Sequence, residues 1–164
     1  IGKEIKQQFR EATNRFNLPD AIVSSVGRES NTMGVLHPFL DEKNVALHCV
    51  EAGGAGLEVP GGHCAVLSKG SAGVLHGTRT LILQDANGQT VPTHSICASM
   101  RYPAVGPELA YLKDIGRIKT SAITDVEAVR TSLWMRDHTI SHALKVAKAL
   151  GQGKHVVVSL GARH

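Results

Sequence analysis

The apolar residues of this chain follow two alternating patterns. Residues 3–15 place apolar side chains at helical spacing between charged ones, which predicts an amphipathic helix. Residues 21–26 and 45–50 are short, continuous apolar runs, which are typical of strands buried in a parallel sheet. Residues 33–40 lie between these runs and look helical, with a bend expected at His37-Pro38. The order strand, helix, strand predicts a right-handed βαβ unit.

The same alternation continues in the second half of the chain. Pro107 suits the first turn of a helix, Thr124 is a good N-cap, and Gly151 is a natural helix stop. The expected helices are residues 108–114, a segment after Thr124, and residues 139–150, and the expected strands are 118–123 and 156–158. We therefore predict one α/β domain over residues 1–164, an open, mainly parallel twisted sheet flanked by helices.

The middle of the chain is harder to assign. Residues 52–78 are rich in glycine and lack periodicity, which predicts a long loop. Residues 80–84 and 90–94 flank a polar segment that contains Asn87-Gly88, so we expect a hairpin between these two runs.

Composition excludes some classes of function. The 164 residues are 42% hydrophobic and 20% charged, with a net charge of +4 and no block of basic residues. Dispersed charge and an aromatic content of 4% argue against nucleic-acid binding. No apolar run approaches the roughly 18 residues of a membrane helix. The chain has no initiator Met or leader, so we expect it to begin within a longer protein.

Cysteine and histidine usage is also informative. Cys49, Cys64 and Cys97 form no C-x-x-C pair, which argues against a disulfide framework and for a reducing, cytoplasmic setting. Among nine histidines, His138 and His142 are four residues apart and would share one face of a helix. No H-E-x-x-H or second ligand pair accompanies them, so we expect surface or hydrogen-bonded histidines and no metal site.

The loop after the first strand is the natural place for a ligand, because ligands of α/β sheets bind beyond the carboxyl ends of strands. Backbone N–H groups between Gly27 and Asn31 could hold a phosphate at the start of the next helix. Arg28 would help to hold an anion, whereas Glu29 would repel one. A phosphate-ligand binder at the Gly27 loop is therefore one alternative.

Short motifs spread over nearly the whole chain occur in the same order as in one known protein family, and together they make a resemblance to that family specific. They are Leu18-Pro19-Asp20-Ala21-Ile22-Val23, Val26-Gly27, Ser30-Asn31-Thr32-Met33-Gly34, His37-Pro38-Phe39-Leu40-Asp41, Val50-Glu51-Ala52-Gly53-Gly54, Val74-Leu75-His76-Gly77, Leu83-Gln84-Asp85, Asn87-Gly88-Gln89, Thr93-His94-Ser95-Ile96, Tyr102-Pro103, Val105-Gly106-Pro107-Glu108, Ala110-Tyr111-Leu112-Lys113-Asp114 and Ser141-His142-Ala143-Leu144. The chain resembles the carboxyl-terminal portion of the tryptophan synthase β subunit, a fold-type II pyridoxal phosphate enzyme family.

The resemblance implies a two-lobed lyase of tryptophan biosynthesis that joins L-serine and indole with pyridoxal 5′-phosphate. It assigns Gly27, Ser30 and Asn31 to cofactor binding, through the family's phosphate loop. The family's Schiff-base lysine follows a histidine in the amino-terminal lobe, and none of the nine lysines here has that context. No catalytic residue is assigned, and we expect the isolated chain to be inactive.

The departures from the family fall on its chemistry. Arg28 and Glu29 replace two glycines of the phosphate loop, and Arg101 stands where the family has an aspartate that closes over the substrate. Segment 134–140 is shorter than the matching segment of the family, which holds a glutamate beside the cofactor ring. Asp137 is the nearest carboxylate in this chain. Near the end of the chain, Gly161 aligns with the serine that faces the pyridine nitrogen, and only a displaced Ser159 could substitute.

Because the departures concentrate at positions that carry the family's chemistry, an alternative is a non-catalytic pseudoenzyme or interaction module of the same ancestry. An apolar face would then be covered by the missing amino-terminal lobe, another subunit or a second copy of the chain. A fragment or an error-bearing sequence would show the same pattern.

Overall fold

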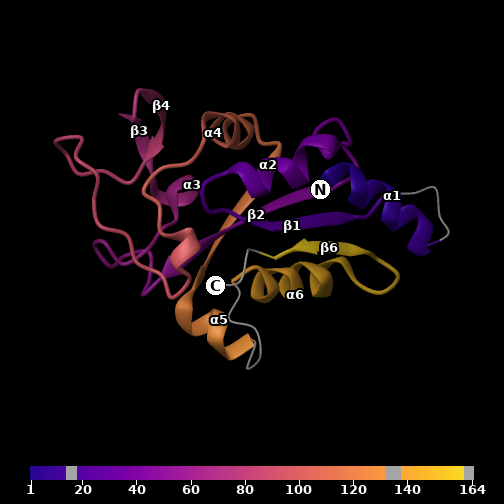
Figure 1. Ribbon diagram of the computed structural model, residues 1–164. Coiled ribbons are helices and arrows are strands. Elements are labelled where there is room, and N and C mark those ends of the chain that lie inside the picture. The colour runs from indigo at the N-terminus through magenta and orange to yellow at the C-terminus, as the bar shows by residue number, and fades with distance from the viewer. Residues whose placement is uncertain (14–17, 132–137, 161–164) are drawn as a thin grey trace.

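The computed structural model describes residues 1–13, 18–131 and 138–160 (Figure 1). Its centre is a sheet of four strands in the order β5-β2-β1-β6, and every neighbouring pair is parallel. The strands are β1 Ala21–Ser25, β2 Ala46–Gly54, β5 Ile118–Thr124 and β6 Val156–Ser159. The predicted fold class, a mainly parallel α/β sheet flanked by helices, is confirmed.

Helices cover both faces of the sheet (Figure 1). On one side lie α1 Gly2–Thr13, α2 Ser30–Leu36, the 3₁₀ turn η1 His37–Phe39 and α4 Pro107–Asp114, and on the other α5 Asp125–Thr131 and α6 His138–Leu150. Alternation along β1 divides the core, because Ile22 packs into one apolar cluster while Ala21 and Val23 pack into the other. The central strand β1 is thus buried on both faces, as its apolar run predicts, whereas the residues of the edge strand β6 are only half-buried.

Two elements differ from their predicted bounds. The helix expected from residue 33 begins at Ser30 and passes into the 3₁₀ turn, where Pro38 sits in the first turn. Strand β2 continues to Gly54, inside the predicted loop. A Cβ at Gly53 would lie 3.0 Å from the backbone of Ile123, so glycine here permits close strand approach. The glycine-rich composition therefore marks tight packing as well as turns.

The predicted hairpin forms over a short stretch beside its turn: Gln84 bridges Thr90, and the Val91 N–H donates to the Leu83 carbonyl oxygen at 3.0 Å. A longer hairpin precedes it, in which β3 Ser71–Leu75 pairs antiparallel with β4 Thr78–Ile82, so that residues 80–82 of the first predicted run pair with β3. His76 (φ 49°) and Gly77 (φ 77°) form the two-residue turn, whose left-handed conformation suits the twist of a hairpin. The expected long loop also contains the short helix α3 Val66–Lys69.

The second half matches its predicted elements closely. Thr124 and Glu127 cap α5 reciprocally: the Thr124 N–H donates to Glu127 Oε2 at 3.0 Å, and the Glu127 N–H donates to Thr124 Oγ1 at 3.3 Å. The expected apolar stripe of α6 is only partly covered, because Ala143 is buried while Leu144 is 47% exposed. Within the described ranges, no helix is long and apolar enough to cross a membrane.

Candidate functional site

The Gly27 loop leaves the carboxyl end of β1, as its position in the sequence predicts. Gly27 is half-buried, and a Cβ there would lie 2.9 Å from the carbonyl oxygen of Ser99, so no larger residue fits without movement. The loop is tied to the strand by the buried Thr32, whose Oγ1 donates a 2.7 Å hydrogen bond to the carbonyl oxygen of Ser25. Ser30 is exposed and Asn31 is half-buried; both lie in the first turn of α2.

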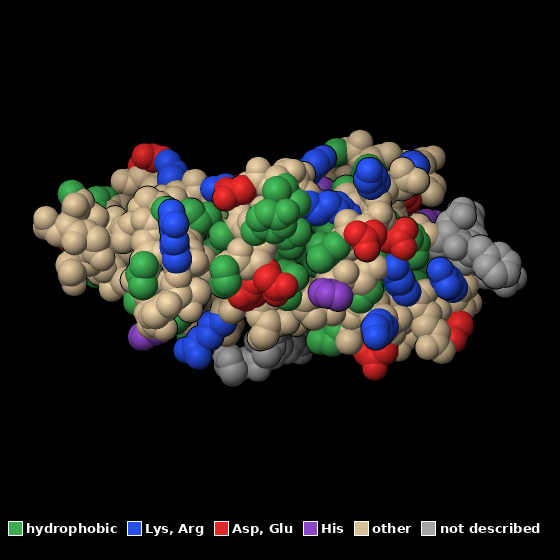
Figure 2. Space-filling model, turned by 90° about the horizontal axis from the view of Figure 1, so that it is seen from above, with side chains coloured by type: hydrophobic (Ala, Val, Ile, Leu, Met, Phe, Trp, Pro, Cys, Tyr) green, Lys and Arg blue, Asp and Glu red, His purple; other side chains and the backbone are tan. Residues whose placement is uncertain are grey.

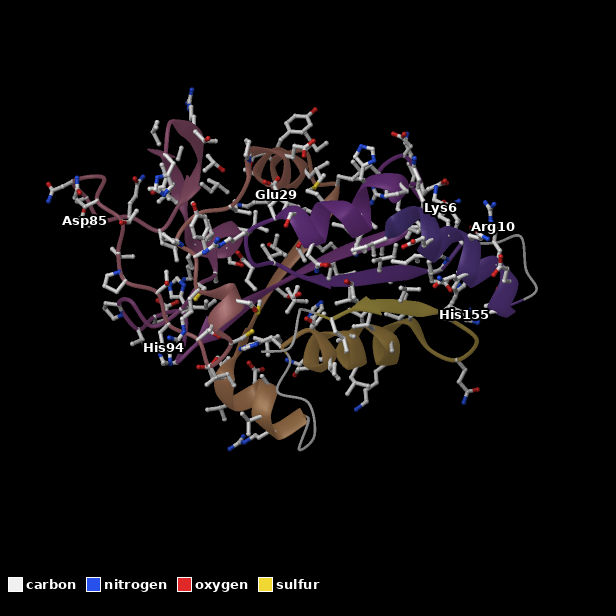
Figure 3. The ribbon with its side chains drawn as sticks, viewed as in Figure 1. Lys6, Arg10, Glu29, Asp85, His94 and His155 are labelled. Atoms are coloured by element: carbon white, nitrogen blue, oxygen red, sulfur yellow. The ribbon has the colours of Figure 1, made fainter. Side chains whose placement is uncertain are left out.

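Glu29 has an unusual backbone and a distant partner. Its φ of 93° lies in the left-handed region that favours glycine. Its Oε1 accepts a 3.3 Å hydrogen bond from the N–H of Leu109, in the first turn of α4. A Cβ added at Gly106 would overlap the Glu29 carboxylate, so that side chain fills the space beside the α4 terminus. Figure 3 shows Glu29 between α2 and α4.

Opposing effects act on the pKa of the Glu29 carboxyl. Burial raises the pKa of the Glu29 carboxyl, and the hydrogen bond from Leu109 acts in the opposite direction. The nearby Glu108 carboxylate raises the pKa further. A positive helix terminus therefore holds this carboxylate against a desolvation cost.

The two segments with altered charge lie together. The Arg28 guanidinium stands 5.4 Å from the ring centroid of Tyr102, and Arg101 Nε donates a 2.6 Å hydrogen bond to the carbonyl oxygen of Ser95. Sequence reasoning treated these positions separately. The periodicity of the chain carries no signal for a contact between residues 74 positions apart.

A cluster around Asp125 lies at the carboxyl ends of β2 and β5, where Figure 3 labels His94. Asp125 Oδ1 lies 3.0 Å from Nε2 of the fully buried His138, and Oδ2 lies 3.4 Å from Nε2 of the half-exposed His94. Oδ2 also accepts a 3.1 Å hydrogen bond from the N–H of Ile96. Asp125 is the first residue of α5, and its contacts tie the 94–96 segment to that helix.

A second buried acid, Glu51, organises the end of β2. Its carboxylate accepts hydrogen bonds from the N–H of Leu67 at 2.6 Å and from the N–H and Oγ of Ser68 at 2.9 and 2.7 Å. Burial raises the pKa of Glu51 to about 7 despite these donors. In the sequence, Glu51 marks the end of a strand and belongs to the motif Val50-Glu51-Ala52-Gly53-Gly54, but no sequence signal predicted its contacts with Leu67 and Ser68.

The remaining predicted positions are partly outside the described residues. Asp137 and Gly161 are in that group, as is residue 134 where the shortened segment begins. Ser159 is the last residue of β6 and is half-buried. Across residues 1–13, 18–131 and 138–160, no group of three or more His, Cys, Asp or Glu side chains is arranged to hold a metal ion.

Comparison with known proteins identifies relatives over almost the whole chain, although no family model matches it. Tryptophan synthase beta chains from Leptothrix cholodnii, Vesicomyosocius okutanii and Methylibium petroleiphilum are 46%, 43% and 44% identical to 99% of this chain. The chain spans only 40%, 43% and 42% of their respective lengths.

The fold also has a solved counterpart. A fungal L-serine ammonia-lyase from Rhizomucor miehei superposes with a TM-score of 0.63 over 98% of this chain and 51% of that one. At 20% identity this similarity shows the fold alone. The resemblance to the tryptophan synthase β subunit, which separate motifs indicate in the sequence, is confirmed over 99% of this chain.

Proposed function

We propose that this chain is one portion of a tryptophan synthase β-type protein and that by itself it does not make tryptophan. By resemblance, the whole protein would join L-serine and indole with pyridoxal 5′-phosphate, which supplies the electron sink for that chemistry when bound. Gly27, Ser30 and Asn31 are then the positions that would face the cofactor phosphate. The similarity to tryptophan synthase beta chains over 99% of this chain supports this assignment of ancestry.

The observation that carries the inactivity proposal is the Glu29 carboxylate. Glycine at position 29 would add no side chain to the loop, whereas Glu29 adds a carboxylate that the Leu109 N–H holds at the start of α4. A phosphate bound about 4 Å from that carboxylate would be repelled by about 4 kcal/mol near a protein surface. The donor set present does not fit a phosphate dianion, and we derive no reaction step through the cofactor.

The sequence context of the lysines also supports the inactivity of the isolated chain. None of the nine lysines follows a histidine, which is the context that the resemblance requires for the cofactor-bound lysine. Lys6, Lys69, Lys145 and Lys154 instead form ion pairs with carboxylates at the surface. We propose that a region outside this chain supplies the nucleophilic amine.

The same proposal accounts for the uncovered side of α6. A groove of about 260 Å³ there is lined by apolar side chains of α6 and β6, including Ile140, Leu144, Ala147, Val156, Val158 and Leu160. Because the relatives are more than twice as long as the chain, we propose that residues 1–164 form one unit of a longer two-lobed protein. The other lobe, or another subunit, would cover such apolar surface.

The test is a titration of the purified chain with pyridoxal 5′-phosphate, followed by addition of L-serine and indole. We expect no tryptophan, and phosphate affinity that rises at least tenfold in the double variant Arg28→Gly, Glu29→Gly. Glu58→Gln is the matched control, because Glu58 is an exposed acid paired with Lys69 away from the loop. Tryptophan made by the unaltered chain would contradict the proposed inactivity, and unchanged affinity in the double variant would contradict the role of Glu29.

A further inference from the structure

Two histidines from distant parts of the chain meet on the α6 side of the sheet. His48 is on β2 and His142 is on α6, and His48 Nδ1 lies 3.2 Å from His142 Nε2. Their ring centroids are 5.3 Å apart, with planes tilted by 47°. Both side chains are half-buried, so water reaches the pair from one side. Nothing in the proposed function uses these residues.

The spacing of the two nitrogens suits a shared transition-metal ion. Metal–imidazole bonds of about 2.0–2.1 Å at angles between square-planar and tetrahedral place two ligand nitrogens roughly 2.9–3.4 Å apart. The observed 3.2 Å lies inside that interval. A metal ion would take the place of the proton that one ring now donates to the other, once both rings turn so that their lone pairs converge on it.

A third side chain sets the orientation of one ring. Ser121 Oγ, on β5, lies 3.1 Å from Nδ1 of His142. If Nδ1 carries the proton and donates it to Ser121, then Nε2 presents its lone pair toward His48. Such a partner on the far nitrogen is the usual companion of a metal-bound histidine. Both rings stay neutral, and only the tautomer of His142 is selected.

Burial, aided by nearby positive groups, lowers the pKa of both rings. Burial lowers the pKa of His48 to about 4, with further lowering by His142 and Lys119. Burial and the Lys145 ammonium lower the pKa of His142. Lys145 also forms a 3.0 Å ion pair with Glu127, which moderates its repulsion of a cation. A metal ion would therefore meet little competition from protons near neutral pH.

We propose that His48 and His142 form a two-histidine site for a divalent transition-metal ion, oriented by Ser121. Because no third His, Cys, Asp or Glu completes a ligand set among the described residues, water fills the remaining positions. The site is then open and exchangeable, and it prefers Cu²⁺ over Ni²⁺ and Zn²⁺ by the ordinary order of divalent affinities.

The experiment is a calorimetric titration of the full chain with Cu²⁺ and then Zn²⁺ at pH 7.5 in a non-coordinating buffer. We expect an equivalent of bound metal whose affinity falls at least tenfold in His48→Gln and in His142→Gln, and roughly tenfold in Ser121→Ala. His37→Gln is the matched control, because His37 is exposed and belongs to another element. Unchanged affinity in both histidine variants would overturn the proposal.

Spectroscopy of the unaltered chain tests the site even where the histidine variants fail to fold. Imidazole nitrogen NMR with Zn²⁺ should shift His48 Nδ1 and His142 Nε2 selectively, and Cu²⁺ electron paramagnetic resonance should show two coupled nitrogens. Shifts confined to other histidines would contradict the site. This test is independent of the proposed synthase ancestry, since neither readout involves pyridoxal phosphate or tryptophan.

Discussion

Glu51 and Glu29 hold their carboxylates in similar places and differ in how the fold supports them. Each accepts backbone N–H groups at the start of a helix, α3 for Glu51 and α4 for Glu29, and burial raises the pKa of each. Glu51 extends from a regular strand to three donors, whereas Glu29 extends from a left-handed backbone to a single 3.3 Å bond with Leu109. The first is an anchor of the fold, and the second occupies a position that suits glycine.

Replacing Glu51 should have the largest effect. In Glu51→Gln an amide NH₂ would face the N–H of Leu67 or Ser68, leaving buried donors without an acceptor. We expect a loss of about 3 kcal/mol in the free energy of unfolding, measured by urea denaturation. Ser68→Ala is the control, because it removes one donor of the three and should cost about 1 kcal/mol. Equal losses in the two variants would contradict the anchor role.

The pH dependence of stability should carry the next largest effect. The pKa of Glu51 is raised in the folded chain to about 7, above the 4.5 of an unperturbed carboxyl. The folded state therefore holds a proton that the unfolded state has lost between these values. This contribution to stability is fully present below pH 4.5 and is lost as pH rises to 7.

We expect that loss to be about 3 kcal/mol, read from urea midpoints across the pH range. Glu51→Gln has no carboxyl at this position, so it should show a flatter profile between pH 4.5 and 7. A slope identical to that of the unaltered chain would assign the proton to another group.

The left-handed backbone at Glu29 should have a smaller effect on stability, and two variants separate this effect from the loss of the bond to Leu109. Glu29→Ala and Glu29→Gly both remove the bond to Leu109, but only glycine accommodates a φ of 93° without strain. We expect Glu29→Gly to be more stable than Glu29→Ala by about 1 kcal/mol. Thermal unfolding followed by circular dichroism measures the difference. Equal stability would show that the loop relaxes to another backbone conformation.

The smallest effect should come from Arg28. Its guanidinium is exposed and lies over Tyr102 at 5.4 Å, so Arg28→Ala should cost about 0.5 kcal/mol or less. Urea denaturation of Arg28→Ala and Arg28→Lys side by side is the measurement. A cost above about 1 kcal/mol would mean that this stacking fixes the loop as firmly as Glu29 does.

The sequence was sufficient where local pattern decides the structure. Residues 21–26 had to be a buried strand because six consecutive small or apolar positions leave no polar face. The sequence signal Asn87-Gly88 located one hairpin turn, and the other hairpin was missed because its first turn position holds His76 where the usual signal is asparagine, aspartate or glycine. The turn at Asp85–Gly88 forms as local chemistry predicts, and residues 83–85 pair with 89–91 beside it, whereas residues 80–82 pair with β3.

The candidate site was predictable as a loop, and its contacts were not. Gly27, Ser30 and Asn31 were located by their position after β1 and by resemblance. The direction of the Glu29 side chain depends on α4, 80 residues later, and the His48–His142 pair joins positions 94 apart. Such contacts are set by how the elements pack on the sheet, which periodicity does not encode.

The pairing of β1 with β6 has a consequence for how the chain acquires its shape during synthesis. Asp20, just before β1, accepts hydrogen bonds from Lys154 Nζ and from the His155 N–H, the latter 135 positions later. One neighbour of β1 is therefore absent until residues 156–159 have left the ribosome. A parallel strand with an unpaired flank is prone to association in that interval.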